Sequence, residues 1–265
     1  MKRYVIGLVT ISLSSVIWAQ PLRSDKGWAI HPQKTEADWQ ALTRGDNLVL
    51  GKLVTAQPAP NYQYTGSDLK QLTDGVLAGA EGRMWTDKRA VGWAYHEYVR
   101  LVLDLGQPQP VSRVLLRLQI IGKDNTLPRL TNLALSLEGD YYFPVRSLAE
   151  KVHPEDNPAL SFEPLPTDPP GIYAISLDAG YRARYVRLDF TTHGILVCDE
   201  IAVMAATGAV GEIPPAPPGK REYFDNVFAY HLGRMGPGVA AGLRASRPMA
   251  ADERHAWLAR KVGVA

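Results

Sequence analysis

Short apolar runs separated by Gly, Pro, Asn and Asp dominate the chain from Asn47 to about Ala205. Runs bounded in this way are typical of β-strands. No apolar pattern of helical period is long enough to cover a sheet between them, which disfavours a parallel sheet with crossover helices. We therefore expect an all-β fold, whose clearest strands span residues 98–105, 111–121, 130–137, 172–177, 184–190 and 195–204.

Several of these runs alternate between apolar and polar residues, most clearly at 112–118 and 185–190. A strand with this pattern turns one face toward a core and the other toward water. Two packed antiparallel sheets, a β-sandwich, satisfy many such strands at once. The core is then expected to contain Val102, Leu116, Val186 and Ile201.

The first 20 residues have the pattern of a signal peptide. Lys2 and Arg3 give a basic start, an apolar run extends from Val5 to Trp18, and the small residue Ala19 follows. This run is short for a membrane span, and no second run of about 18 apolar residues follows it. We expect cleavage near Ala19 and a periplasmic or secreted protein with no stable membrane insertion. The alternative is an uncleaved single-pass anchor.

The segments outside the expected domain (46–206) differ in composition. Residues 21–45 are polar and predict a lead-in with one short helix at 35–42, capped by Thr35. Residues 207–219 are rich in proline and predict a stiff, extended linker. Residues 220–265 predict a partly helical C-terminal extension that is too short to bury a core alone. The extension either packs on the sandwich or begins a truncated domain, and we favour the second interpretation.

Charge and cysteine content narrow the possible functions. The formal net charge is +2, and Lys2 and Arg3 of the leader supply it, so the rest of the chain is neutral. A neutral chain lacks the basic surface that nucleic-acid binding requires, so we expect no nucleic-acid partner. Cys198 is the only cysteine and lies in an apolar run. We expect it to be buried and inert.

Signatures of catalysis are few in the sequence, although acidic pairs occur at Glu155-Asp156 and Asp199-Glu200. There is no Gly-x-Ser-x-Gly, no His-Glu-x-x-His and no phosphate-binding loop. Asp199 and Glu200 are adjacent in a predicted strand, so we expect their side chains to point to opposite faces, where they cannot flank one glycosidic bond. His231 and His255 have no acid or thiol at a telling spacing. We expect a non-catalytic protein.

A succession of short phrases resembles a known family. Residues 47–56 read NLVLGKLVTA, and Leu72-Thr73-Asp74-Gly75, Trp85 and the phrase VLDLG at 102–106 follow in that order. Residues 183–203 then supply RYVRL and DEIAV. Together these resemble the coagulation factor 5/8 C-type, or discoidin, family of galactose-binding-like domains, over about residues 46–205. A closer likeness is to discoidin-like modules of secreted bacterial polysaccharide-associated proteins, in QLTDG, WT, VGW and DEI.

The resemblance implies an eight-stranded jelly-roll sandwich, often with a structural calcium ion, and a ligand site formed by loops at one end. Asp74 matches the family's loop aspartate that binds the ion, and Glu200 matches the carboxylate at the start of the last strand. Calcium favours such hard oxygen ligands. The stretch from Val76 to Met84 is longer than the family pattern. It leaves the other ligands, and the ion itself, open.

Glycan binding requires an exposed aromatic face for the sugar ring and polar groups for its hydroxyls. Three loops offer such residues, at 61–64, 83–96 and 139–142, and a fourth precedes the last strand. Trp85 matches a core tryptophan of the family, and Trp93 and Tyr95 are equally compatible with core or ligand roles. His193 is either a ligand contact or a turn residue. The candidate ligand-binding residues are Trp93, Tyr95, His96, Arg89, Tyr62, Tyr64, Tyr141 and His193.

These features predict an exported, non-catalytic carbohydrate-binding module whose partner is a polysaccharide or a cell-surface glycan. Two alternatives belong to other classes. In the first, the chain is the N-terminal binding domain of a larger carbohydrate-active enzyme similar to a glycoside hydrolase. In the second, it is an adhesive module that binds protein or lipid headgroups. A shared scaffold does not determine which sugar its loops bind.

Overall fold

The computed structural model describes residues 22–24, 27–79, 82–96, 98–121, 130–149, 170–191 and 194–215. The expected leader (1–20), the C-terminal extension (220–265) and His193 lie outside the described residues.

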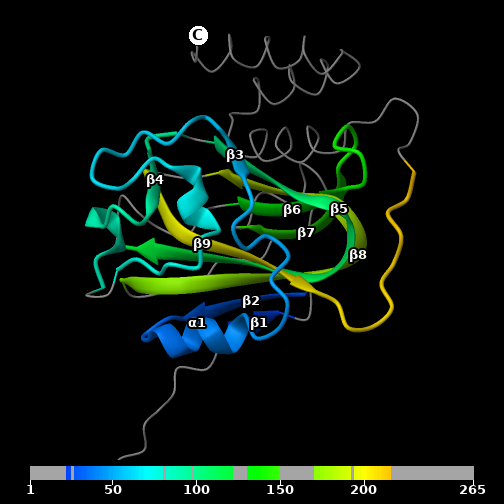
Figure 1. The fold of residues 1–265 in the computed structure, drawn as a ribbon. Coiled ribbons are helices and arrows are strands. Elements are labelled where there is room, and N and C mark those ends of the chain that lie inside the picture. Colours follow the sequence, from blue (N-terminus) through cyan, green and yellow to red (C-terminus); the bar gives the residue numbers. More distant parts are fainter. Residues whose placement is uncertain are drawn as a thin grey trace, which may run out of the picture.

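Antiparallel β-strands make up most of the described structure, which confirms the all-β class (Figure 1). The described residues form the strands β1 (Leu22–Ser24), β2 (Trp28–Pro32), β3 (Val54–Gln57), β4 (Val91–Ala94), β5 (Tyr98–Ile120), β6 (Leu130–Ser136), β7 (Phe143–Ala149), β8 (Gly171–Thr191) and β9 (Ile195–Ala205). The helices are α1 (Glu36–Leu42) and two single 3₁₀ turns, η1 (Leu69–Leu72) and η2 (Met84–Thr86). No helix in these ranges has the length and apolar character that a membrane span requires.

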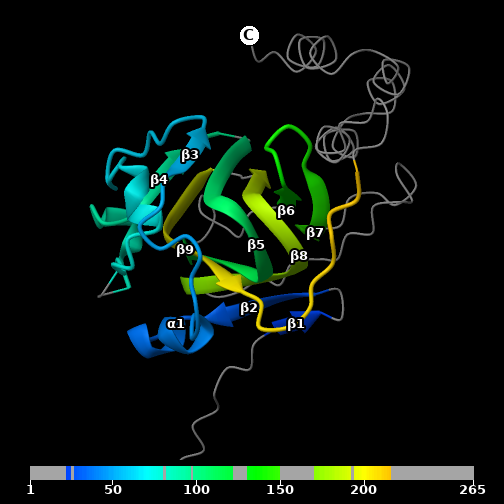
Figure 2. The same ribbon diagram turned by 45° about the vertical axis from the view of Figure 1, so that its right-hand side comes forward.

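Two long strands, β5 and β8, pair along their whole length and belong to both layers of the sandwich. In one layer the order is β2-β8-β5-β9-β4; in the other, β3 pairs with β5 and β6 joins β8 to β7. The ribbon bends between the layers, where the register shifts and where Gly106 and Gly180 adopt positive φ angles of 84° and 75° (Figure 2). Glycine adopts this conformation without steric cost, so it permits the bend.

The main core lies between the two layers and takes side chains from both. Leu116, Val186 and Ile201 are at most 2% exposed, as predicted. The prediction that Val102 belongs to the core is wrong by one residue, because its neighbours Leu101 and Leu103 are the ones that are fully buried. Strand side chains alternate between faces, so Val102 lies on the outer face and is only half-buried.

The segment predicted as a lead-in belongs to the sandwich. Strand β2 pairs with β8, with Ile30 opposite Ile175, and Trp28 and Ile30 are buried in the main core. The short helix is confirmed, with Thr35 as its N-cap. The carboxylate of Asp38 accepts a hydrogen bond from the Thr35 backbone N–H at 2.7 Å. The expected domain boundary at residue 46 therefore falls inside the folded unit.

The start of the proline-rich segment also packs on the fold. The Gly211 N–H donates to the Gly180 carbonyl at 2.8 Å, and the Arg182 N–H donates to the Gly211 carbonyl at 3.0 Å. Ile213 packs against the main core. A free linker therefore does not begin at residue 207. Cys198 is fully buried in the core, as predicted, and burial raises the pKa of its thiol well above its usual range.

Candidate functional site

Several strand ends and their connections meet at one end of the sandwich. Gln57 at the end of β3 pairs with Arg100 near the start of β5. Ala94 at the end of β4 pairs with Ile195 at the start of β9. The chain that follows β3, the β4–β5 connection and the β8–β9 turn therefore lie at the same end, which is the place the sequence predicted for a ligand site.

The segment after β3 is tied to β4 by hydrogen bonds. The backbone N–H groups of Asn61 and Tyr62 both donate to the Gly92 carbonyl, at 3.1 and 3.0 Å. The Asn61 side chain accepts from the Ala94 N–H at 2.7 Å and donates to the Ala94 carbonyl at 3.1 Å. These contacts fix the backbone of the segment against a strand.

Two further contacts hold the same segment. A Cβ on Gly92 would lie 2.9 Å from the Cβ of Tyr62, closer than carbon atoms approach, so only glycine lets the segment pack this closely. The ammonium of Lys88 donates to the carbonyls of Gln63 and Thr65, at 2.8 and 3.0 Å. The loop is thus held from both sides.

Three tyrosines gather on this platform, and we call Tyr62, Tyr64 and Tyr95 the tyrosine cluster. The rings of Tyr62 and Tyr64 meet edge to face with centroids 5.4 Å apart. Tyr64 is 50% exposed and Tyr95 77% exposed, whereas Tyr62 is half-buried. Burial, together with the nearby hydroxyls of Tyr64 and Tyr95, raises the pKa of Tyr62.

Tyr95 is held in an unusual backbone conformation. Its φ angle is 59°, a left-handed value that a bulky residue adopts only when its surroundings impose it. Its N–H donates to the carbonyl of Gly194 in the β8–β9 turn at 2.6 Å. This contact fixes the backbone from which the exposed Tyr95 ring projects. The next residue, His96, is partly exposed.

Trp93 is a correction to the predicted site. Residues 83–96 were expected to form a loop, but residues 91–94 form β4, in which Trp93 pairs with Leu196. The ring is 0% exposed and its Nε1 donates to the Pro58 carbonyl at 2.9 Å. A fully buried ring cannot stack on a ligand, so Trp93 supports the end loops from beneath.

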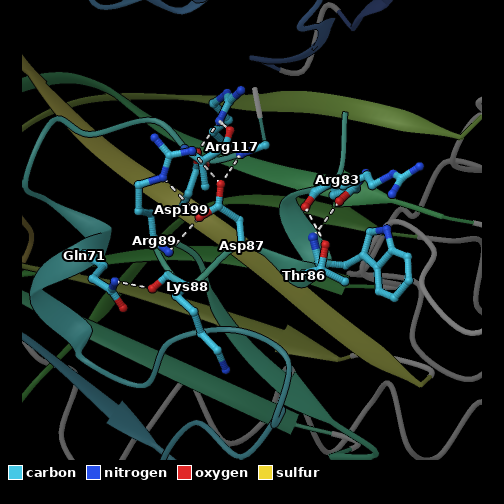
Figure 3. A network of polar contacts seen from close by, with 12 residues as sticks. Gln71, Arg83, Thr86, Asp87, Lys88, Arg89, Arg117 and Asp199 are labelled. Atoms are coloured by element: carbon cyan, nitrogen blue, oxygen red, sulfur yellow. Dashed lines mark hydrogen bonds and ion pairs between the residues drawn. The ribbon is translucent and has the colours of Figure 1, made fainter. Parts of the chain in front are cut away.

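Arg89 lies in a separate polar network (Figure 3). Its guanidinium pairs with Asp87 at 2.7 Å, and Asp87 also accepts from the Gly79 N–H at 2.9 Å. The side-chain hydrogen bonds from Arg89 hold the pKa of Asp87 well below its usual range. Arg89 therefore organises its own loop.

Tyr141 lies in the β6–β7 connection, where it is partly exposed and its N–H donates to the Asp140 side chain at 2.7 Å. β6 runs from Leu130, opposite Thr191, to Ser136, opposite Tyr185, so its connection to β7 lies at the end of β6 away from Tyr98, which also pairs with Thr191. The structure brings Tyr62, Tyr64 and Tyr95 together and leaves Tyr141 and Arg89 elsewhere in the arrangement.

Asp74 and Glu200, the residues suggested for calcium, do meet. Glu200 is 1% exposed, and its Oε1 accepts from the Gly75 N–H at 2.5 Å. Burial raises the pKa of Glu200 to about 8, and the carboxyls of Asp199 and Asp74, the latter hydrogen-bonded to Glu200, add to the effect. In the described ranges no third His, Cys, Asp or Glu completes a cluster. Calcium takes six to eight oxygen ligands, so this pair would supply only part of such a site.

The prediction that Asp199 and Glu200 point to opposite faces of the strand is wrong. The register of β9 against β5 shifts between Leu118↔Cys198 and Arg117↔Glu200, which leaves Asp199 as the extra residue of a bulge. Asp199 accepts from the Ala78 N–H at 2.7 Å, and Glu200 accepts from the Gly75 N–H. Both donors belong to residues 74–79, which we call the covering segment. Both carboxylates therefore lie on one face.

The two carboxylates differ in their surroundings, since Glu200 borders a groove of about 500 Å³ and Asp199 does not. Asp199 is 0% exposed and forms an ion pair with Arg117, whose side chain is 6% exposed (Figure 3). Glu200 is buried beneath the segment that carries Asp74 and Gly75. The buried acids of β9 thus fasten the covering segment to the sheet.

Comparison with known proteins gives similarity only to solved structures. No family model matches the sequence, and no curated protein matches it. A fucose-binding module of Streptococcus pneumoniae is 15% identical, with 61% of this chain and 99% of that chain covered and a TM-score of 0.40. A chitosan-binding module from a chitosanase/glucanase of Paenibacillus sp. IK-5 is 19% identical, with 60% and 99% covered and a TM-score of 0.39. SpGH29 is 16% identical with a TM-score of 0.38, and the match covers 61% of this chain and 28% of that one.

Proposed function

We propose that this protein is a non-catalytic carbohydrate-binding module that binds a glycan through the tyrosine cluster. The observation that carries the proposal is that the touching rings of Tyr62 and Tyr64 lie in a loop whose Asn61 is hydrogen-bonded to Ala94, the residue before Tyr95. Tyr64 and Tyr95 are exposed. Exposed aromatic rings stack against the apolar face of a sugar, and their hydroxyls reach the sugar's own hydroxyls.

The rigidity of the platform supports the same function. Association costs free energy wherever a loop must be ordered on binding. Here the segment that carries Tyr62 and Tyr64 is fixed to β4 through Asn61 before any ligand arrives. A preformed site of this kind avoids the cost of ordering the loop when the ligand binds. His96 follows Tyr95 and is the nearest candidate for an additional polar contact.

A structural calcium ion at Asp74 and Glu200 is a second part of the proposal. The ion would supply positive charge between the buried Glu200 and the exposed Asp74 beside it. Its effect would be on stability, since the pair ties the segment that follows η1 to the middle of β9. Ligand binding at the tyrosine cluster would not pass through the ion.

We also propose that the protein acts outside the cytoplasm, on the basis of the leader pattern at residues 1–20. N-terminal sequencing of protein recovered from the periplasm or medium tests this point. A new N-terminus near residue 20 is expected, and a mature protein that still begins at Met1 contradicts it.

A glycan array probed with the purified chain tests the function directly. We expect selective binding to one class of neutral or acidic glycan, competed by the free oligosaccharide. If the folded chain binds no glycan, but binds lipid vesicles or a protein, the adhesive alternative replaces the proposal.

A further inference from the structure

A concave feature lies on the outer face of the layer formed by β3, β5, β8, β6 and β7, and its lining includes none of the tyrosine cluster. It is a groove of about 490 Å³. Its lining includes Thr55 and Gln57 of β3, Arg100 and Val102 of β5, Arg187 of β8, and Tyr142 of the β6–β7 connection. Its volume falls in the range of small-molecule sites, about 300–1,000 Å³.

Two guanidiniums converge on one buried carboxylate beside this groove. Asp189, which is 1% exposed, accepts from the Arg100 Nε at 3.0 Å through Oδ1 and from the Arg187 Nε at 2.9 Å through Oδ2. The Tyr98 hydroxyl donates to the same Oδ1 at 2.7 Å. The formal charges of these three side chains, two arginines and one aspartate, sum to +1.

Arg187 keeps its charge at neutral pH and is held in a fixed position. Burial lowers its pKa to about 10, against the opposing attraction of Asp189. The guanidinium carbon lies 4.3 Å from the centroid of the Tyr142 ring, a cation–π contact that sets the plane of the group. Arginine held in this way suits recognition of a planar carboxylate or of a sulfate.

The rest of the lining is polar and suits a sugar. Thr55 and Gln57 are exposed on the outer face of β3, at one wall of the groove, and the half-buried Tyr142 forms part of another. Hydroxyl and amide groups pair with sugar hydroxyls, and the aromatic ring offers an apolar surface. Positive charge, polar walls and an aromatic ring thus meet in one groove.

We propose that this groove is a second saccharide site that binds an acidic sugar unit, a ring bearing a carboxylate or a sulfate. The proposal extends the proposed glycan-binding function, but it rests on Arg100, Arg187 and Tyr142, none of which belongs to the tyrosine cluster. The preferred polymer would then be an acidic polysaccharide.

Titration calorimetry of the full chain tests the proposal, with oligogalacturonate as the carboxylated probe, its methyl ester as the neutral match and dextran sulfate as the sulfated probe. We expect the chain to bind at least one acidic probe, with affinity that falls as salt rises. The methyl ester should bind at least about tenfold more weakly than the carboxylate if the carboxylate is the ligand.

Two variants locate the site. Arg100→Gln removes a charge from the groove, and Thr55→Trp fills the groove from its exposed wall without touching the buried ion pair. Each should weaken binding of the acidic probe about tenfold or more. Arg184→Gln is the matched control, because it removes one arginine charge from the same strand as Arg187 at a pair with Asp104 that does not line the groove.

The outcomes separate this proposal from the proposed function. Tyr95→Ala should not change the affinity of the groove for the acidic probe. Arg100→Gln should not change the affinity of the tyrosine cluster for a neutral glycan. The groove proposal is overturned if neither acidic probe binds, or if Arg100→Gln and Thr55→Trp bind the acidic probe as tightly as Arg184→Gln does.

Discussion

At the scale of single residues, two ion pairs of the same chemistry differ in burial. The side chains of Arg117 and Asp199 are 6% and 0% exposed, whereas those of Arg184 and Asp104 are 37% and 42% exposed. Removing one partner of a buried pair leaves a charge without its counter-ion in a medium that solvates it poorly. An exposed pair that loses a partner is simply solvated.

We therefore predict that Arg117→Met destabilises the fold by about 3–5 kcal/mol. Arg184→Met should cost no more than about 1 kcal/mol. Urea unfolding of both variants measures the difference. Equal costs would show that the covering segment, rather than Arg117, keeps Asp199 in place.

Asp87 predicts a dependence of stability on pH. Hydrogen bonds from Arg89 depress its pKa in the folded state, so the unfolded state binds the proton more readily. The stabilisation it provides is fully present above the unfolded pKa of about 3.9 and is lost as the pH falls toward the lower folded value.

The measurement is the difference in unfolding free energy between the wild-type chain and Asp87→Asn at several pH values. We expect a constant difference from about pH 5 to 8 that shrinks progressively below about pH 4. A difference that stays constant down to pH 3 would mean that the negative charge of Asp87 does not contribute to the free energy of unfolding.

At the scale of elements, alternation of side chains predicted the long strands and failed for the short ones. The runs predicted at 98–105 and 111–121 are both parts of β5, those at 172–177 and 184–190 are both parts of β8, and the run at 195–204 belongs to β9. β4 has only four residues, Val-Gly-Trp-Ala, too few to show a period. It fell inside the loop expected at residues 83–96, and Trp93 was therefore kept among the ligand candidates.

The calcium proposal belongs to this scale, because the ion would join the segment after η1 to β9. We predict that calcium raises the melting temperature and that excess chelator lowers it, with a shift that grows with ion concentration by mass action. Glu200→Gln should abolish the shift, and the exposed carboxylate variant Asp178→Asn should preserve it. Melting curves that coincide in calcium and in chelator would end the proposal.

At the scale of the whole molecule, β5 and β8 bend through both layers and so bring distant segments to one end. That arrangement places Tyr62 and Tyr64 of one loop beside Tyr95 of another, and the family resemblance had already indicated a site formed by end loops. The groove was missed because Arg100, Arg187 and Asp189 fit the pattern of a solvated strand face. Only the pairing of β5 with β8 shows that they share one position.

The central claim is that the tyrosine cluster binds glycan. The most direct test is the affinity of the strongest array ligand for the wild-type chain, for Tyr64→Ala/Tyr95→Ala and for Tyr141→Ala, each with its melting temperature. A stacked ring is worth on the order of 1 kcal/mol, so the double variant should lose at least about tenfold in affinity while its melting temperature is unchanged. Tyr141→Ala should bind as the wild type does. Wild-type affinity in the double variant, or a loss confined to Tyr141→Ala, would contradict the account.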